Sequence, residues 1–89
     1  MLVVSADFVN RRPLVVAVVP GTKGSNLPRD LDTNVRLEPV ETGLALETVF
    51  LCFQIRAIDQ QRFRGSPAGR VSDGALQRIE DTLRLCLDL

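Results

Sequence analysis

The sequence contains no histidine, tryptophan or tyrosine, and its formal charge is zero, from eleven basic and eleven acidic residues. Without histidine, the Ser-His-Asp and Cys-His arrangements of nucleophilic catalysis and all histidine metal ligands are excluded. Acid–base chemistry would fall to Asp, Glu, Lys or Arg, or be replaced by hydrogen bonding and electrostatic stabilisation. The zero net charge also excludes the global positive field of a scanning nucleic-acid binder, so any contact with RNA must be local.

Cysteine is scarce, and signals for export or membrane insertion are missing. Cys52 and Cys86 form no CxxC pair, so a metal site or a disulfide framework is disfavoured and two buried, reduced thiols are expected. The N-terminal run Met1–Ser5 has no basic segment, and its apolar stretch is too short for a signal peptide or a membrane span. We therefore expect a cytoplasmic protein without membrane contact.

The apolar residues that are present suit a sheet. Hydrophobic residues make up 45% of the chain, and its aromatic residues are four Phe, so Val, Leu and Ile must build the core. A length of 89 residues supports one hydrophobic core, so residues 1–89 are expected to form a single domain. A core of this size is marginal, and a partner subunit would help to stabilise it.

Hydrophobic patterning predicts a mainly β fold closed by a C-terminal α-helix. Strands are expected at residues 2–5, 13–19, 34–38 and 47–59, the last of them covered on both faces. Pro20–Gly21 is expected to end the second strand with a turn, a polar loop to follow over residues 21–33, and residues 7–12 to form a polar connection. Ser72 is expected to cap a helix whose inner face repeats at helical spacing. That face comprises Leu76, Ile79, Leu83, Cys86 and Leu87.

Pro20–Ser25 is a candidate anion-binding turn. Its Gly and Lys residues lack the spacing of a Walker A loop. Backbone N–H groups, the Thr22 hydroxyl and the Lys23 ammonium could nevertheless hold a phosphate. The alternative is an ordinary glycine-rich connector.

Two further clusters have a functional and a structural interpretation. The basic residues Arg11, Arg12, Lys23 and Arg29 lie on two predicted loops that could converge at one end of the sheet, or could simply be solvated. Gln54 and Arg56 share a strand face and are followed by Asp59, and we favour a structural hydrogen-bond cluster over catalysis there.

Several motifs occur in the order found in the MazF/PemK toxins of bacterial toxin–antitoxin pairs, and the sequence resembles that family over nearly its whole length. The matching segments are Leu2–Asn10, like the family's "LVVS" strand with a following Asn, Val18–Thr22, like its "VPxT", and then Gly43–Leu44, Gln54–Asp59 and Gly69–Val71. The resemblance implies a small SH3-like barrel of the MazF/CcdB kind, usually assembled as a homodimer. It also implies an endoribonuclease, or mRNA interferase, that cleaves single-stranded mRNA without a metal or other cofactor.

In the family, the 2′-hydroxyl of the RNA is the nucleophile, and the products are a cyclic phosphate and a 5′-hydroxyl. The resemblance carries Thr22 over as the threonine that contacts the scissile phosphate. By position, Ser5, Asn10 and Lys23 would line the same groove, and Gln54 would support the strand beside it. A cognate antitoxin, acidic and partly disordered, is the implied protein partner.

The sequence departs from the family pattern at two places. The family begins with a strand of the type "RGEIWxVDL" and a loop with an arginine and "RP", and neither precedes Leu2 here. The first family strand is therefore expected to be missing, with Met1 at an internal family position and activity weakened by loss of that arginine. Phe53 stands where many relatives have an acidic residue, so no carboxylate role is carried over to it.

Two non-enzymatic functions compete with the nuclease. Gyrase-poisoning toxins share the barrel, since a fold does not fix a function. A binding protein that sequesters an antitoxin without chemistry is the other alternative.

Overall fold

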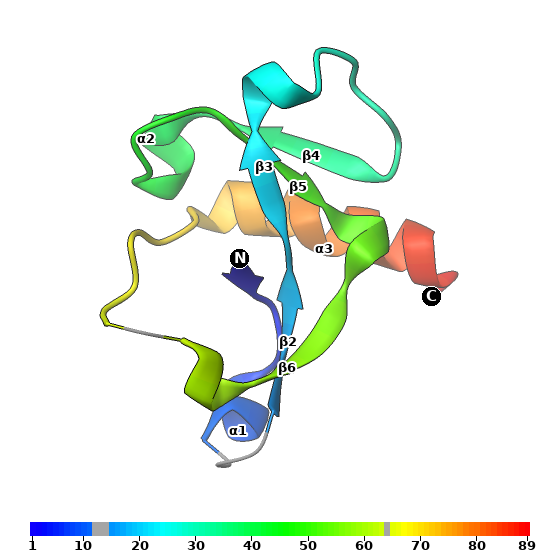
Figure 1. Ribbon diagram of the computed structural model, residues 1–89. Helices are drawn as coiled ribbons and strands as arrows, with labels where there is room; N and C mark the ends of the chain where they lie inside the picture. The colour runs from blue at the N-terminus through cyan, green and yellow to red at the C-terminus, as the bar shows by residue number, and fades with distance from the viewer. Residues whose placement is uncertain (12–14, 64) are drawn as a thin grey trace.

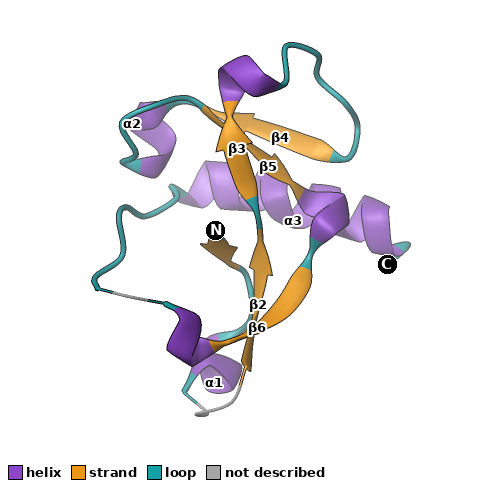
Figure 2. Cartoon of the chain, in the orientation of Figure 1, coloured by secondary structure: helices purple, strands orange, loops and turns teal. Residues whose placement is uncertain are grey.

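The computed structural model describes residues 1–11, 15–63 and 65–89, which form a mainly β protein with a long C-terminal helix (Figures 1 and 2). The strands are β1 (Leu2–Val3), β2 (Val15–Val19), β3 (Gly21–Lys23), β4 (Asn34–Leu37), β5 (Thr48–Leu51) and β6 (Arg56–Asp59). The helices are α1 (Asp7–Asn10), α2 (Pro39–Thr42) and α3 (Asp73–Leu87). Single 3₁₀ turns follow three of the strands: η1 (Gly24–Asn26), η2 (Cys52–Gln54) and η3 (Gln60–Arg62).

The strands form two antiparallel three-stranded sheets, in the orders β1-β2-β6 and β3-β5-β4. The chain passes from one sheet to the other at Pro20, between β2 and β3, and at η2, between β5 and β6. These two crossing points lie side by side, because the Leu51 N–H donates to the Pro20 carbonyl at 2.9 Å. Thr22 and Lys23 therefore lie just beyond the junction of the two sheets.

The turn expected at Pro20–Gly21 is wrong. The chain continues extended from β2 into β3 (Figure 1). Proline lacks an N–H donor and so interrupts a hydrogen-bond ladder, but its fixed φ is compatible with an extended chain. Gly21 allows β3 to approach the side chains of β5 closely, and does not form a turn. A Cβ there would lie 2.9 Å from Thr48 Cγ2 and 3.1 Å from Phe50 Cε1.

The single strand expected over residues 47–59 is also wrong. It divides into β5 and β6, which belong to different sheets, with η2 between them. Because the 3₁₀ turn interrupts the alternation of side chains, Phe53 is 52% exposed, whereas Phe50 is buried. The polar stretches 7–12 and 21–33 contain the short elements α1, β3 and η1, which the composition did not predict. The helix α2, which begins at Pro39, was not predicted either.

Other expectations are confirmed. Val15–Val19 forms β2, with residues 13 and 14 of the expected strand outside the described residues. The strand expected over residues 34–38 forms as β4, and its Val35 and Leu37 are buried in the core. The Ser72 hydroxyl caps α3 by accepting from the Ala75 N–H at 3.3 Å.

Helix α3 packs over the junction of the sheets and covers the core. The core cluster contains Val19 from β2, Val35 and Leu37 from β4, Phe50, Cys52, and Ala75 and Ile79 from α3. Leu87, expected on the inner face, is 49% exposed, because the helix ends there and Asp88 takes a left-handed conformation. Both cysteines are free thiols, with Cys52 buried and Cys86 half-buried. None of the helices in the described ranges has the length and hydrophobicity needed to cross a bilayer.

Candidate functional site

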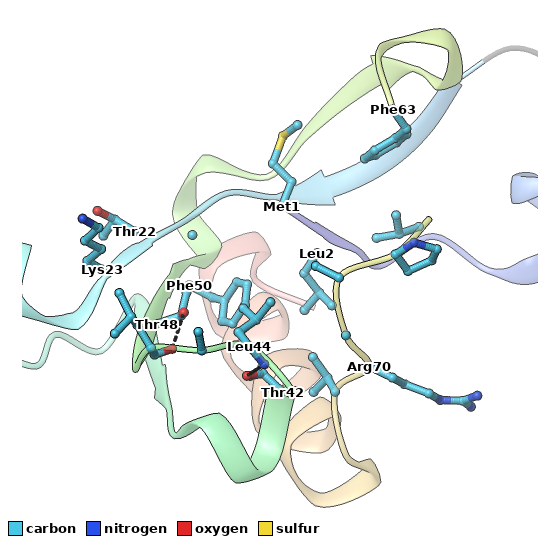
Figure 3. Close-up of a pocket in the computed structure, with 18 of the residues that line it drawn as sticks. Met1, Leu2, Thr22, Lys23, Thr42, Leu44, Thr48, Phe50, Phe63 and Arg70 are labelled. Atoms are coloured by element: carbon cyan, nitrogen blue, oxygen red, sulfur yellow. Dashed lines mark hydrogen bonds between the residues drawn. The ribbon is translucent and has the colours of Figure 1, made fainter. Parts of the chain in front are cut away.

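Thr22 and Lys23 lie on β3 at the rim of an open groove. Thr22 pairs with Val49 of β5 and is half-buried, whereas Lys23 is exposed. The groove has a volume of about 840 Å³ and extends from β3 across Leu44 and Phe50 to the segment of residues 65–71 (Figure 3). Its floor is therefore apolar, and the threonine hydroxyl and the lysine ammonium lie together at one end.

The charges around this groove are of one sign. Among the described residues that line it, the charged side chains are those of Lys23 and Arg70, and no Asp or Glu is present. Neither side chain takes part in any of the ion pairs of the described chain, which involve Arg36, Arg78 and Arg84. Lys23 lies at one end of the groove and the Arg70 side chain extends away from it at the other (Figure 3), so the positive charge available to an anionic ligand near Thr22 is that of Lys23.

The Thr22 hydroxyl is held by a residue that the sequence did not indicate. Asn26, the last residue of η1, donates its side-chain amide to Thr22 Oγ1 at 2.9 Å. Because this bond occupies an acceptor position of the hydroxyl, the Thr22 O–H remains free to donate to a ligand oxygen. Asn26 belongs to no recognisable sequence motif. The 3₁₀ turn η1 brings its side chain back to Thr22.

The turn η1 is fastened to the second sheet by Arg36 of β4. The guanidinium donates to Asp30 Oδ1 at 2.8 Å, to Glu47 Oε1 at 2.7 Å, to the Gly24 carbonyl at 3.1 Å and to the Leu27 carbonyl. Two carbonyls that flank Asn26 are thus bound by one side chain. The sequence places Arg36 only within the strand expected over residues 34–38, and its four contacts depend on the path of the loop.

The same cluster shifts the titration of its members. The hydrogen bonds that Arg36 donates to Asp30 and then to Glu47 raise the pKa of Arg36. The hydrogen bond from Arg36 lowers the pKa of Glu47, whereas the hydrogen bond with Glu47 raises the pKa of Glu38. Arg36 is therefore neutralised by its own carboxylates and is not a free cation for a ligand.

Ser5 and Asn10 bind each other at the far end of β2. Asn10 Nδ2 donates to the Ser5 carbonyl at 3.0 Å, the Ser5 hydroxyl donates to Asn10 Oδ1, and the same hydroxyl accepts from the Ala17 N–H at 3.1 Å. Ala17 precedes Thr22 by five residues of nearly continuous strand, a distance of about 16 Å at the usual rise of a strand. Within one chain, the structure does not bring this pair to Thr22, and their contact with RNA stays a prediction.

The convergence of the basic loops that the sequence left open is not found. Arg11 follows α1, at the opposite end of the β2–β3 line from Lys23 (Figure 1). The reason is that the chain does not turn at Pro20, so the loop before β2 and the loop after β3 leave opposite ends. Arg12 lies outside the described residues. Arg29 is exposed within the loop that Arg36 holds, and Gln54 is exposed at the end of η2, away from the groove lining.

No group of three potential metal-ligating side chains (His, Cys, Asp or Glu) occurs in the part of the chain that the structure describes. The chemical resources of the groove are thus one oriented hydroxyl, two ammonium or guanidinium cations and an apolar floor. Such a set can bind a phosphodiester and stabilise charge on it.

Residues 1–87 match the family of PemK-like, MazF-like toxins of type II toxin–antitoxin systems. The chain belongs to this family. The strand that carries Thr22 and the helix α3 both lie within the matched range.

Individual relatives agree with the assignment. The chain is 37% identical over 75 residues to endoribonuclease MazF9 of Mycobacterium tuberculosis (strain ATCC 25618 / H37Rv), a match that covers 84% of this chain and 61% of that protein. The chain thus spans about three fifths of the length of this curated relative.

Solved structures confirm the fold. A mycobacterial endoribonuclease in complex with its cognate antitoxin superposes with a TM-score of 0.82 at 24% identity, covering 99% of this chain and 79% of that one. The M. tuberculosis toxin MazF-mt6 gives a TM-score of 0.81 at 22% identity, covering 99% of this chain and 84% of that one. The expected fold class, mainly β with a C-terminal helix as in MazF toxins, is therefore confirmed.

Proposed function

We propose that this chain is an endoribonuclease toxin that cleaves single-stranded mRNA at a phosphodiester bound by Thr22 and Lys23. The observation that carries the proposal is the Thr22 hydroxyl, which lies at the rim of an acid-free groove with Asn26 bound to its oxygen. Membership of the family and the name of the relative endoribonuclease MazF9 support it.

The proposed chemistry uses the substrate's own nucleophile. The 2′-oxygen of the RNA attacks the adjacent phosphorus, the bond from phosphorus to the 5′-oxygen breaks, and the products are a cyclic phosphate and a 5′-hydroxyl. The 2′-hydroxyl gives up its proton to water and the leaving 5′-oxygen takes one from water, so the step balances with the substrate and solvent alone. Thr22 donates to a non-bridging oxygen, and the Lys23 ammonium offsets the charge that builds up on the phosphate.

The remaining parts of the proposal concern assembly. Residues 1–89 act as a single domain, in a homodimer, in the cytoplasm, and a cognate antitoxin is the protein partner. The antitoxin-bound mycobacterial neighbour supports that partner. Ser5, Asn10, Arg11, Arg29 and Gln54 are proposed as RNA contacts outside the Thr22 site.

The test is cleavage of a long mRNA transcript in EDTA, with the new 5′-hydroxyl ends mapped by sequencing. Thr22→Val keeps a β-branched side chain but removes the donor, and kcat is expected to fall by about 100-fold, as for loss of one oxyanion-type donor. Thr22→Ser restores the hydroxyl and should keep most of the activity. Thr82→Val is the matched control, because the Thr82 hydroxyl only donates to Arg78 of its own helix.

Two outcomes would contradict the proposal. Equal cleavage by wild type and Thr22→Val would remove Thr22 from the mechanism. No cleavage by the wild type, together with tight binding of an acidic antitoxin peptide, would select the sequestering alternative, and binding to gyrase would select the gyrase-inhibitor alternative.

A further inference from the structure

The hydroxyl of Thr22 is oriented by a loop that has little apolar support of its own. The segment from Ser25 to Asp30 is exposed except for half-buried Leu27. Its fixed points are polar: the Gly24 N–H donates to the Glu47 carbonyl at 2.9 Å, and Arg36 binds the Gly24 and Leu27 carbonyls. The position of Asn26 between them therefore depends on Arg36.

Close packing at Gly24 strengthens this dependence. Gly24 is buried, and a Cβ on it would lie 2.1 Å from Glu47 Oε1 and 2.9 Å from Arg36 Nη1. The Arg36–Glu47 ion pair thus lies directly against the main chain where η1 begins. Arg36 is 21% exposed in this pair, so the contact is partly shielded from water, which distinguishes it from a freely solvated surface ion pair.

We propose that Arg36 is a positioning residue of the Thr22 site, acting through Asn26. The proposal rests on the proposed function, and it names a residue that touches no substrate. Arg36 fixes the two carbonyls that flank Asn26, Asn26 fixes Thr22 Oγ1, and the Thr22 O–H then points to the phosphate. Guanidinium is required because three nitrogens serve four acceptors in a fixed fork, a pattern that lysine cannot reproduce.

The expected signature is a loss of kcat with little change in KM. Orientation of a donor matters most where charge develops, in the transition state, so a misdirected hydroxyl slows the reaction more than it weakens binding. We expect Arg36→Gln and Asn26→Ala each to lower kcat about 10-fold, and KM to change less than 2-fold. A role confined to folding or to bulk charge would instead lower the melting temperature or raise KM.

Double variants separate these possibilities. If Arg36 acts through Asn26, the double variant is no slower than the slower single variant, and neither substitution has a further effect in the Thr22→Val background. Arg36→Lys should not rescue kcat. Arg84→Gln is the matched control, because it removes an equal charge from an ion pair with Asp81 on α3, remote from the loop.

NMR gives a readout that does not depend on RNA cleavage. Relative to the wild type, the Asn26 side-chain amide resonances should shift in Thr22→Val, because the amide loses its acceptor. In Arg36→Gln, the backbone amides of residues 24–27, 29 and 30 should gain fast motion, while those of β2 and β5 stay unchanged. An Asn26 amide that does not respond to either substitution would overturn the proposed link.

The failure of this inference is distinct from failure of the proposed function. A wild type that does not cleave RNA but shows the NMR responses would overturn the nuclease function and leave the Arg36–Asn26–Thr22 link standing. A wild type that cleaves, with Arg36→Gln and Asn26→Ala additive to Thr22→Val, would overturn the link alone. If Arg36→Gln fails to fold, the comparison of Asn26→Ala with and without Thr22→Val still decides whether Asn26 acts through Thr22.

Discussion

Burial in the core lowers the reactivity of the Cys52 thiol. It has no exposed surface, and burial, with a smaller contribution from Cys86, raises the pKa of its thiol from 9.0 to about 11. Since the thiolate is the reactive form, Cys52 should react far more slowly than half-buried Cys86. We expect iodoacetamide at pH 7.5 to label Cys86 at least about 10-fold faster, measured by mass spectrometry of tryptic peptides.

The same shift gives a pH dependence of stability. Because the folded-state pKa of Cys52 is raised, its contribution is fully present below its ordinary pKa of 9.0 and is lost as the pH rises through about 11. The free energy of unfolding should thus fall between pH 9 and 11, and the part due to Cys52 should be absent in Cys52→Ala. Equal labelling of both cysteines, or an unchanged slope in Cys52→Ala, would contradict the assignment.

At this scale, the sequence singled out candidate residues only where they are neighbours in the chain. Thr22 and Lys23 follow each other in β3 and line the groove, although a turn was expected there, and their binding of a phosphate stays a prediction. Asn26 and Arg36 contribute through contacts that span a 3₁₀ turn and two strands, and no local pattern records such contacts. Their roles became visible only with the path of the loop.

Among the connecting elements, the segment of residues 65–71 is held against α2 at a glycine. A Cβ on Gly69 would lie 2.2 Å from the Thr42 carbonyl oxygen, a main-chain atom that cannot move without displacing α2. We expect Gly69→Ala to reduce the free energy of unfolding by about 1–3 kcal/mol, as in other overpacked sites. Urea denaturation monitored by circular dichroism would measure it.

Gly74 is the matched control for that substitution. It lies in the first turn of α3, and a Cβ there meets nothing within 4 Å. Because alanine is the better helix former, Gly74→Ala should stabilise the protein by up to about 1 kcal/mol. Effects of the same sign at both positions would show that backbone entropy, rather than the contact with α2, decides the outcome at Gly69.

Elements whose ends are marked locally could be predicted, whereas sheet membership could not. The alternation of Asn34–Leu37 and the Ser72 cap define β4 and α3 within a few residues. The division of residues 47–59 into two strands depends on which partners each half meets, β3 and β4 on one side and β2 on the other. Pairing over that distance leaves no mark on the hydrophobic pattern of the segment itself.

Across the whole molecule, one packed cluster supports the groove that Thr22 borders. Phe50 lines the groove on one side and belongs to the core cluster on the other. Ile79 of α3, with no exposed surface, packs in the same cluster. The site therefore sits on a rigid junction of two sheets, while its polar residues lie on the exposed rim, where binding residues are commonly found.

The charge of the whole molecule sets how RNA binding should respond to salt. With a net charge of zero, long-range attraction is absent and the cations at the groove must supply the phosphate contacts. Contacts through Lys23 and Arg70 would give a slope of log affinity against log salt of about −1.4, at roughly −0.7 per phosphate of a single strand.

Fluorescence anisotropy with a 2′-O-methyl RNA, which lacks the nucleophile, measures binding without cleavage. Lys23→Met should reduce the slope to about −0.7, whereas Arg84→Met, which changes a cation already paired with Asp81, should leave it unchanged. A wild-type slope steeper than about −4 would mean that many cations outside the groove bind the RNA, and the local surface at Thr22 would then not be the main binding site.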